Sequence, residues 1–367
     1  MAKACYVGID GKARKIKKIY TGVSNVARKV KKGYVGVGGV ARPFFSEEPV
    51  LAYYGTATEF GSGRTQHSAT TVGNYGLFGG GSDAMDDFAV VDAYSSTLVR
   101  STPTGLSVAR KQLAATSVGN YALFGGGYNS GMNTAVATVD AYSSTLVHST
   151  PTDLSNKRYW LAATTVGNYA LFGGGQYPTT TVVDAYSDTL VRSTPTALSA
   201  GRAFLGATSV GNYALFGGGN NSSAVVDAYS STLVRSTPTA LSVGRKELAA
   251  TSVGNYALFG GGNNSSAVVD AYSSTLVRRI PTTLSKGRSA LKATTVGNYA
   301  LFGGGAPTTA VVDAYSDTLV RSIPTALSAG RLYAAATTVG NYALFGGGNG
   351  SGNYYTVVDV YTTITPP

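Results

Sequence analysis

The tetrapeptide Val-Gly-Asn-Tyr occurs seven times in the 367 residues of this chain, and its recurrence restricts the fold more than any other feature. The copies begin at Val72, Val118, Val166, Val210, Val253, Val296 and Val339. Their spacing of 43 to 48 residues is typical of a propeller or a solenoid, in which each repeat is one supersecondary unit. The strands within one repeat unit therefore determine the fold of the whole region.

Each unit predicts four short strands. In the fifth unit, residues 246–253 form the first strand, Gly254-Asn255 is a hairpin turn, and the apolar run 256–259 is a buried second strand. Residues 267–272 and 275–280 complete the unit, and no segment has a sustained helical period. A solenoid needs polar capping repeats, and none is present. The pattern therefore predicts an all-β, closed, seven-bladed β-propeller over residues 49–367.

The fourth strand shows how the ring closes. Strands of the Leu-Val-Arg type follow the third strand in six units only. The missing copy stands before the first unit, where Leu51-Ala52-Tyr53-Tyr54 occupies the register of Thr232-Leu233-Val234-Arg235. We therefore predict that the N-terminal strand, residues 50–56, completes the last blade and removes both open edges.

The repeat units resemble those of the Kelch family. The resemblance rests on Leu258-Phe259-Gly260-Gly261 at the end of the second strand, Tyr272 on the third, and the link from Pro281 to Arg288. It covers about residues 50–361. The tryptophan that the family has shortly after the tyrosine is absent, since Leu276 or Val277 stands near that place. The resemblance implies a divergent, Kelch-like propeller.

Residues 1–48 differ from the rest in charge and in repeat. They carry eleven Lys and Arg against three acids, a net charge of +8, whereas the remaining residues carry +3. Tyr6, Tyr20 and Tyr34 are 14 residues apart, and each begins a short strand followed by a two-residue turn. This pattern predicts a β-meander of three hairpin repeats that is too small to be very stable alone.

The run from Ala27 to Val37, Ala-Arg-Lys-Val-Lys-Lys-Gly-Tyr-Val-Gly-Val, resembles N-terminal modules of structural proteins of tailed bacteriophages and prophages. The resemblance implies a protein of the tail or capsid surface, assembled in the bacterial cytoplasm. Residues 1–46 would then attach the chain to other virion proteins or oligomerise it. Nucleic-acid binding by the basic cluster is the alternative. The absence of a stacking platform beyond the repeated tyrosines makes it the weaker one.

The composition gives little support to catalysis. Cys5 is the only cysteine and His67 and His148 are the only histidines, which excludes an intramolecular disulfide, a cysteine zinc site and the copper site of oxidase propellers. No sialidase-type box and no Ser/His/Asp set is present. We therefore expect no enzyme, no cofactor and no metal. Without an apolar run of about 18 residues, we expect no membrane insertion either.

Two charged residues recur in every unit. An aspartate precedes the tyrosine of the third strand, and an arginine opens the first strand. The aspartates are Asp92, Asp140, Asp184, Asp227, Asp270, Asp313 and Asp359, and the arginines are Arg64, Arg110, Arg158, Arg202, Arg245, Arg288 and Arg331. Seven copies at one place indicate a structural role. For the arginines an alternative stays open: a ring of guanidinium groups at the channel mouth that meets acidic ligand groups.

The units differ most in the two residues after each arginine and in the loop between the second and third strands. These connections lie on the same face of a blade, so their variation predicts a recognition surface, with relaxed loop drift as the alternative. We expect this surface to bind a host-surface glycan or protein, with the aromatic sector of Tyr159, Trp160 and Phe204 as its centre. The candidate ligand-binding residues are Lys111, Tyr159, Trp160, Phe204, Lys246, Tyr333, Gln176, Tyr177, Asn220, Asn221, Arg158 and Arg202. A purely architectural virion protein remains the second hypothesis, and an enzyme the third.

Overall fold

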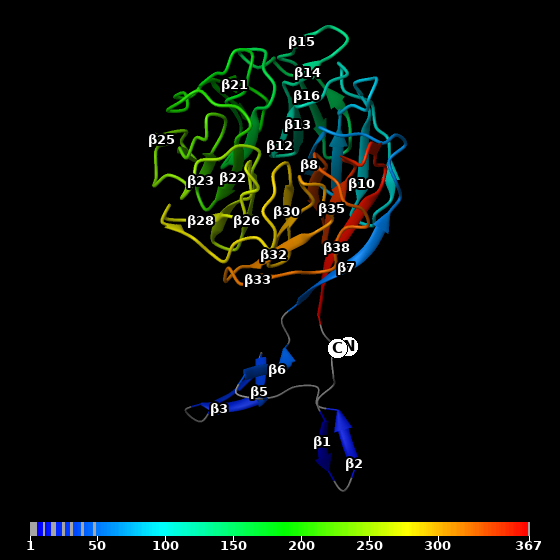
Figure 1. Ribbon diagram of the computed structural model, residues 1–367, viewed down its shortest axis with the longest axis vertical. Helices are drawn as coiled ribbons and strands as arrows, with labels where there is room; N and C mark the ends of the chain where they lie inside the picture. Colours follow the sequence, from blue (N-terminus) through cyan, green and yellow to red (C-terminus); the bar gives the residue numbers. More distant parts are fainter. Residues whose placement is uncertain are drawn as a thin grey trace. The chain divides into compact units, whose positions relative to one another are not determined.

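The computed structural model (Figure 1) describes residues 49–365 and, before them, the strands within residues 6–46. The chain divides into two compact units, Met1–Ala52 with Thr363–Pro367, and Tyr53–Thr362. Every regular element in the described part is a strand. Within that part there is accordingly no helix long and apolar enough to cross a membrane.

Seven four-stranded antiparallel sheets form the blades of a propeller, as the repeats predict. From inner to outer strand, blade 1 is β8 (Ser68–Val72), β9 (Tyr75–Gly79), β10 (Val91–Ser95) and β11 (Arg100–Ser101); blade 2 is β12 (Ala114–Val118), β13 (Tyr121–Gly125), β16 (Val139–Ser143) and β17 (His148–Ser149); blade 3 is β18 (Ala162–Val166), β19 (Tyr169–Gly173), β20 (Val183–Ser187) and β21 (Arg192–Ser193); blade 4 is β22 (Gly206–Val210), β23 (Tyr213–Gly217), β24 (Val226–Ser230) and β25 (Arg235–Ser236). Blade 5 is β26 (Ala249–Val253), β27 (Tyr256–Gly260), β28 (Val269–Ser273) and β29 (Arg278–Arg279); blade 6 is β30 (Lys292–Val296), β31 (Tyr299–Gly303), β32 (Val312–Ser316) and β33 (Arg321–Ser322); blade 7 is β34 (Ala335–Val339), β35 (Tyr342–Gly346), β38 (Val358–Ile364) and β7 (Val50–Ala57). Figure 1 shows the inner strands around a common axis.

Blade 7 is built from both ends of the repeat region. Its outer strand β7 precedes blade 1 in sequence, yet it lies beside β38. Residues 50–56 thus occupy the place that the strand count assigns to them. The inner strand β34 of this blade contacts β8 of blade 1, so the ring of inner strands is closed.

The hydrophobic core lies between neighbouring blades. Val118 and Leu123 of blade 2 pack with Leu161 and Phe172 of blade 3 in one buried cluster. The phenylalanine explains the glycine that ends each second strand: a Cβ atom on Gly125 would lie 2.7 Å from Cε1 of Phe172. A side chain at this position would therefore force adjacent blades apart.

A buried ion pair joins the segment that enters each blade to the third strand of that blade. In blade 4, Nη2 of Arg202 donates to Oδ2 of Asp227 at 2.5 Å and to the carbonyl of Phe216 at 3.1 Å. The backbone N–H of Ser199, in the same entering segment, donates to Oδ1 of Asp227 at 3.1 Å. The pair recurs as Arg64–Asp92, Arg110–Asp140, Arg158–Asp184, Arg245–Asp270, Arg288–Asp313 and Arg331–Asp359. All seven arginines and aspartates are buried, which confirms the structural interpretation of both series.

Each of these aspartates has a second side-chain partner nearer the outer edge of the blade. The partner is an arginine in five blades: Arg100, Arg192, Arg235, Arg278 and Arg321. In blade 2 it is His148, whose Nε2 lies 2.7 Å from Asp140. In blade 7 it is Tyr53, whose hydroxyl donates to Asp359 at 2.7 Å, and burial together with this carboxylate raises the pKa of Tyr53 to about 12. The closing strand therefore brings its own partner for the buried carboxylate.

Arg202→Met tests the importance of the buried pair. This change leaves the carboxylate of Asp227 in the interior without its main counter-charge, and removing one partner of a buried pair typically costs about 3–5 kcal/mol. Arg235→Met is the matched control, because Arg235 contacts the same carboxylate at 2.8 Å but is one-quarter exposed. Its loss is expected to cost about 1 kcal/mol or less. Equal losses of unfolding free energy in denaturant titrations would contradict this assignment.

The junction between blades 7 and 1 has different side chains from the others. Between blades 1 and 2, Leu106 and Leu113 pack over Gly80. Phe60 and His67 take these two places at the closing junction, with ring centroids 5.7 Å apart. His67 is 2% exposed, and burial and the neighbouring Arg64 lower its pKa well below its ordinary value. The folded protein therefore keeps this imidazole neutral.

This junction predicts a pH-dependent stability. An unfolded histidine titrates near pH 6.5, so below that pH the unfolded chain binds one proton that folded His67 does not. Stability then falls by about 1.4 kcal/mol per pH unit, or about 2 kcal/mol at pH 5. His67→Leu introduces the residue of blades 2 to 6 and abolishes this contribution. The measurement is the unfolding free energy of both proteins at pH 7.5 and pH 5. His148 is present in both and cancels, so identical pH dependence would show that His67 titrates normally.

Before residue 49 the structure describes three pairs of antiparallel strands. They are β1 (Tyr6–Ile9) with β2 (Lys12–Lys15), β3 (Tyr20–Val23) with β4 (Val26–Lys29), and β5 (Lys32–Val37) with β6 (Val40–Ser46). The turns within these pairs and the side chains of residues 1–48 lie outside the described residues. The basic anchoring module predicted for residues 1–48 stays a prediction.

Candidate functional site: the axial pocket

Seven residues surround the axis at the start of the inner strands, each placed two positions after a buried arginine. We call them the mouth ring: Gln66, Gln112, Trp160, Phe204, Glu247, Ala290 and Tyr333. The backbone N–H of each donates to the carbonyl of the preceding one at 2.9–3.0 Å, and Gln66 donates to Tyr333. The hydrogen bonds thus form a closed circle that links every blade to the next.

All seven residues of the mouth ring have left-handed backbone conformations, with φ between 50° and 59°. Glycine adopts this conformation without steric cost, whereas another residue held there costs about 1–3 kcal/mol. None of the seven is a glycine. The chain therefore keeps side chains around the axis at positions where the backbone favours their absence, and strain of this kind is concentrated at functional sites.

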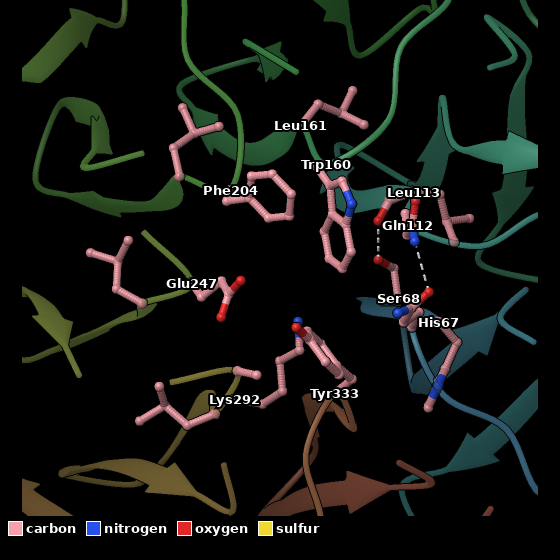
Figure 2. A pocket seen from close by; sticks show the side chains of 15 residues that line it. His67, Ser68, Gln112, Leu113, Trp160, Leu161, Phe204, Glu247, Lys292 and Tyr333 are labelled. Carbon is pink, nitrogen blue, oxygen red and sulfur yellow. Dashed lines mark hydrogen bonds between the residues drawn. The ribbon is translucent and has the colours of Figure 1, made fainter. Parts of the chain in front are cut away.

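Three aromatic side chains of the mouth ring pack together at the mouth of the pocket. The ring centroid of Trp160 lies 4.7 Å from that of Phe204 and 5.8 Å from that of Tyr333. Trp160 belongs to blade 3 and Tyr333 to blade 7, so their contact crosses the mouth. Figure 2 shows this contact dividing the pocket into two sides. Burial and the charge of Glu247 raise the pKa of Tyr333, which keeps its hydroxyl protonated.

The two sides of the pocket differ in chemistry. On one side, the glutamines and the serine are hydrogen-bonded: Nε2 of Gln112 donates to Oε1 of Gln66 at 2.9 Å, and the hydroxyl of Ser68 donates to a backbone carbonyl at 2.5 Å. On the other side lie Glu247 and Lys292 (Figure 2). Within the described residues, neither the carboxylate nor the ammonium group has a hydrogen bond or an ion pair. This side therefore holds two charged groups that are free to bind a ligand.

The pocket between these side chains has a volume of about 100 Å³. It is lined by the whole mouth ring and by the residues that follow it on the inner strands, including His67, Leu248 and Lys292. It has room for a substituent of a larger ligand.

Blade 6 departs from the other blades at the pocket. Its mouth-ring residue, Ala290, is the smallest of the seven, and the residue two positions later is Lys292. The other blades have only small residues at that second position: Ser68, Ala114, Ala162, Gly206, Ala249 and Ala335. Burial lowers the pKa of Lys292. Blade 6 thus leaves space at the mouth and places an amine below it.

The predicted aromatic sector divides into two groups. Trp160 and Phe204 line the axial pocket, whereas Tyr159 lies on the rim, 5.2 Å from the ring of Tyr128 and 6.4 Å from that of Tyr177. Tyr159 and Gln176 exchange backbone hydrogen bonds, which fixes the rim beside the mouth. The structure therefore brings Tyr159, Gln176 and Tyr177 together, but in a different place from Trp160.

The remaining lysines and asparagines of the predicted site lie on the rim. Lys111 is paired with Asp87 at 3.5 Å. The ammonium group of Lys246 lies 5.4 Å from the ring centroid of Phe204, at the edge of the pocket. Asn220 exchanges two hydrogen bonds with the backbone of Ala203, through its own N–H and its side-chain oxygen, while Asn221 is exposed. Of these four, only Lys246 contacts a residue of the pocket.

Arg158 and Arg202 do not belong to the site. Both are 0–1% exposed and their guanidinium groups meet Asp184 and Asp227 of their own blades. The Kelch resemblance implies arginines that can bind acidic groups of a ligand, but here each guanidinium group is paired with a buried aspartate of its own blade. Both residues were predicted to bind a ligand, but the entering segment turns their side chains into the blade, outside the lining of the axial pocket.

The sequence reasoning missed four residues that complete the pocket: Gln66, Gln112, Glu247 and Lys292. Three of them are the second members of the variable pairs. Their position therefore predicted that they lie on the recognition surface, but their side chains were not named as ligand-binding. Lys292 is different. Its signal was a lysine in a column of alanine, glycine and serine, which becomes visible only when the units are aligned on their arginines.

Among the residues that the structure describes, no group of three or more His, Cys, Asp or Glu side chains could hold a metal ion. The pocket itself contains one carboxylate, one amine and one imidazole, the last of which is packed at the blade junction. No protein-family model and no curated protein matches the chain. Function is therefore inferred from the chemistry of the pocket.

Proposed function

We propose that the protein is a binding protein of a bacteriophage virion, whose propeller recognises a glycan of the host surface through the axial pocket. The observation that carries the proposal is the mouth ring. It holds Trp160, Phe204 and Tyr333 at strained backbone positions and places them beside uncommitted polar groups. Aromatic faces and hydrogen-bonding side chains together match the apolar faces and the hydroxyl groups of a sugar.

Binding is favoured over catalysis by the contents of the pocket. Glycoside hydrolysis usually requires two carboxyl groups on opposite sides of the scissile bond, and the lining of this pocket includes only Glu247. A metal-dependent reaction would need a cluster of ligands that the described residues do not offer. One carboxylate, one amine and an aromatic wall are sufficient for recognition.

The assignment to a virion is supported by the resemblance of residues 27–37 to modules of bacteriophage structural proteins. A small basic module joined to a closed propeller also suits an anchored receptor-binding protein, because the outer edge strands of blades 1 to 6 are only two residues long and offer little for attachment. In this proposal residues 1–46 contact other virion proteins and the propeller is displayed. A decoration protein whose propeller contacts only virion proteins is the competing function.

Trp160→Ala tests the binding site. The change is expected to weaken binding to purified host cell-wall glycan by about 2 kcal/mol or more, about 30-fold, because a half-buried indole at the centre of an interface is a typical hot spot. The melting temperature should change little. Tyr159→Ala is the control, since Tyr159 is adjacent in sequence but lies outside the pocket. Trp160 is the only tryptophan of the chain, so its fluorescence also reports directly on occupancy of the pocket.

Two results would contradict this site. If Trp160→Ala lowers the melting temperature and leaves binding unchanged, the indole only fills the mouth. If Tyr159→Ala has the larger effect on binding, the ligand lies on the rim, over Tyr128 and Tyr177.

Removal of residues 1–46 tests the anchor. The truncated chain is expected to keep its propeller fold and its glycan affinity, because the blades and their closing strand are complete without these residues. Its mass in solution should fall to that of a monomer, or its incorporation into particles should be lost. An unchanged mass together with normal incorporation would rule out attachment through this segment.

A further inference from the structure

We infer that the sugar recognised at the axis is acidic, and that its carboxylate enters the pocket through the space left by Ala290 and binds the ammonium group of Lys292. The inference rests on the proposed glycan-binding function and specifies its ligand. It is carried by blade 6, where a small mouth-ring residue and a lysine replace the usual arrangement of the other blades.

The lysine has no structural partner that explains its position. The inner strands of the other blades have Ser, Ala or Gly here, so the fold does not require a long side chain. Within the described residues the ammonium group has no hydrogen bond and no ion pair. Burial lowers its pKa, because desolvation destabilises the charged form. An anion beside it would reverse that destabilisation.

The pocket has room for a carboxylate. Its volume of about 100 Å³ is sufficient for such a group beside Lys292. The sugar ring would then lie at the mouth, beside Trp160 and Tyr333, which line the pocket. A terminal carboxylate can reach Lys292 while its sugar ring lies at the mouth, whereas a phosphodiester within a polymer carries a sugar or polyol on both sides.

Glu247 makes the recognition selective. It belongs to the mouth ring, whereas Lys292 lies on the first position of β30, and both line the same side of the pocket (Figure 2). A carboxylate at the mouth accepts hydrogen bonds from sugar hydroxyls and repels additional negative charge. The arrangement therefore suits one acidic group on an otherwise neutral sugar.

The experiment compares oligosaccharides that end in glucuronic, galacturonic or N-acetylneuraminic acid, each paired with its carboxyl-reduced form. At neutral pH the protein is expected to bind at least one acid at least 10-fold more tightly than its reduced partner, measured by calorimetry and by Trp160 fluorescence. Lys292→Ala should remove this preference and retain the fold, because alanine stands at this position in four other blades. Lys286→Ala, at an exposed lysine of the same entering segment, should change nothing.

Two further measurements locate the carboxylate. Ala290→Gln introduces the residue of blades 1 and 2, fills the space above Lys292, and should abolish the acid preference although the lysine is present. In the wild type, the preference should decline as the pH rises through the pKa of Lys292, at a lower pH than for an ordinary lysine. Equal binding of acidic and reduced sugars, or a preference that survives Lys292→Ala, overturns the inference and leaves the glycan-binding proposal standing. Failure to bind any member of the panel overturns both.

Discussion

The buried carboxylate on the third strand of each blade is the interaction on which the propeller depends. It forms an ion pair with the arginine that enters the blade, and in blades 2 to 7 it also accepts a hydrogen bond from a backbone N–H of the entering segment. A charge so deep in the protein is not a strong source of stability by itself, because its desolvation offsets the attraction. Its effect is positional. It fixes where the connecting segment crosses from one blade to the next, and with it the two residues that follow the arginine.

The mouth ring follows from this constraint. Once each arginine is held by its aspartate, the next two residues must cross the end of the inner strand, and the second of them closes a hydrogen bond to the neighbouring blade. The left-handed conformation is the backbone geometry that this crossing requires. The same feature that completes the ring of blades therefore presents seven side chains to one axis. The backbone atoms of these residues close the ring of blades, whereas their side chains line the pocket.

The repeat made the fold predictable and left the site only partly so. Seven copies of one tetrapeptide determine blade number, strand order and even the origin of β7, because a ring with one outer strand missing must take it from elsewhere. The aromatic residues Trp160 and Phe204 could be placed on the correct face from their offset to the arginine. Their separation from Tyr159 could not, because adjacent residues in a left-handed turn diverge in a way that sequence spacing does not encode. The burial of Arg158 and Arg202 could not be predicted either, because the residue type does not show whether an arginine side chain points to the variable face or into the blade.

A ring of near-identical blades also limits where specificity can reside. A ligand on the axis meets seven equivalent positions, and if these were occupied identically the site could distinguish ligands only by size. The chain breaks the equivalence at the mouth ring, where no residue type except glutamine occurs twice, while the buried framework stays almost unchanged from blade to blade. Blade 6 extends the asymmetry one step deeper, from Ala290 to Lys292. Residues that no packing requirement explains are the ones expected to determine which ligand binds. In this propeller, Glu247, Ala290 and Lys292 are such residues, and all three line the same pocket.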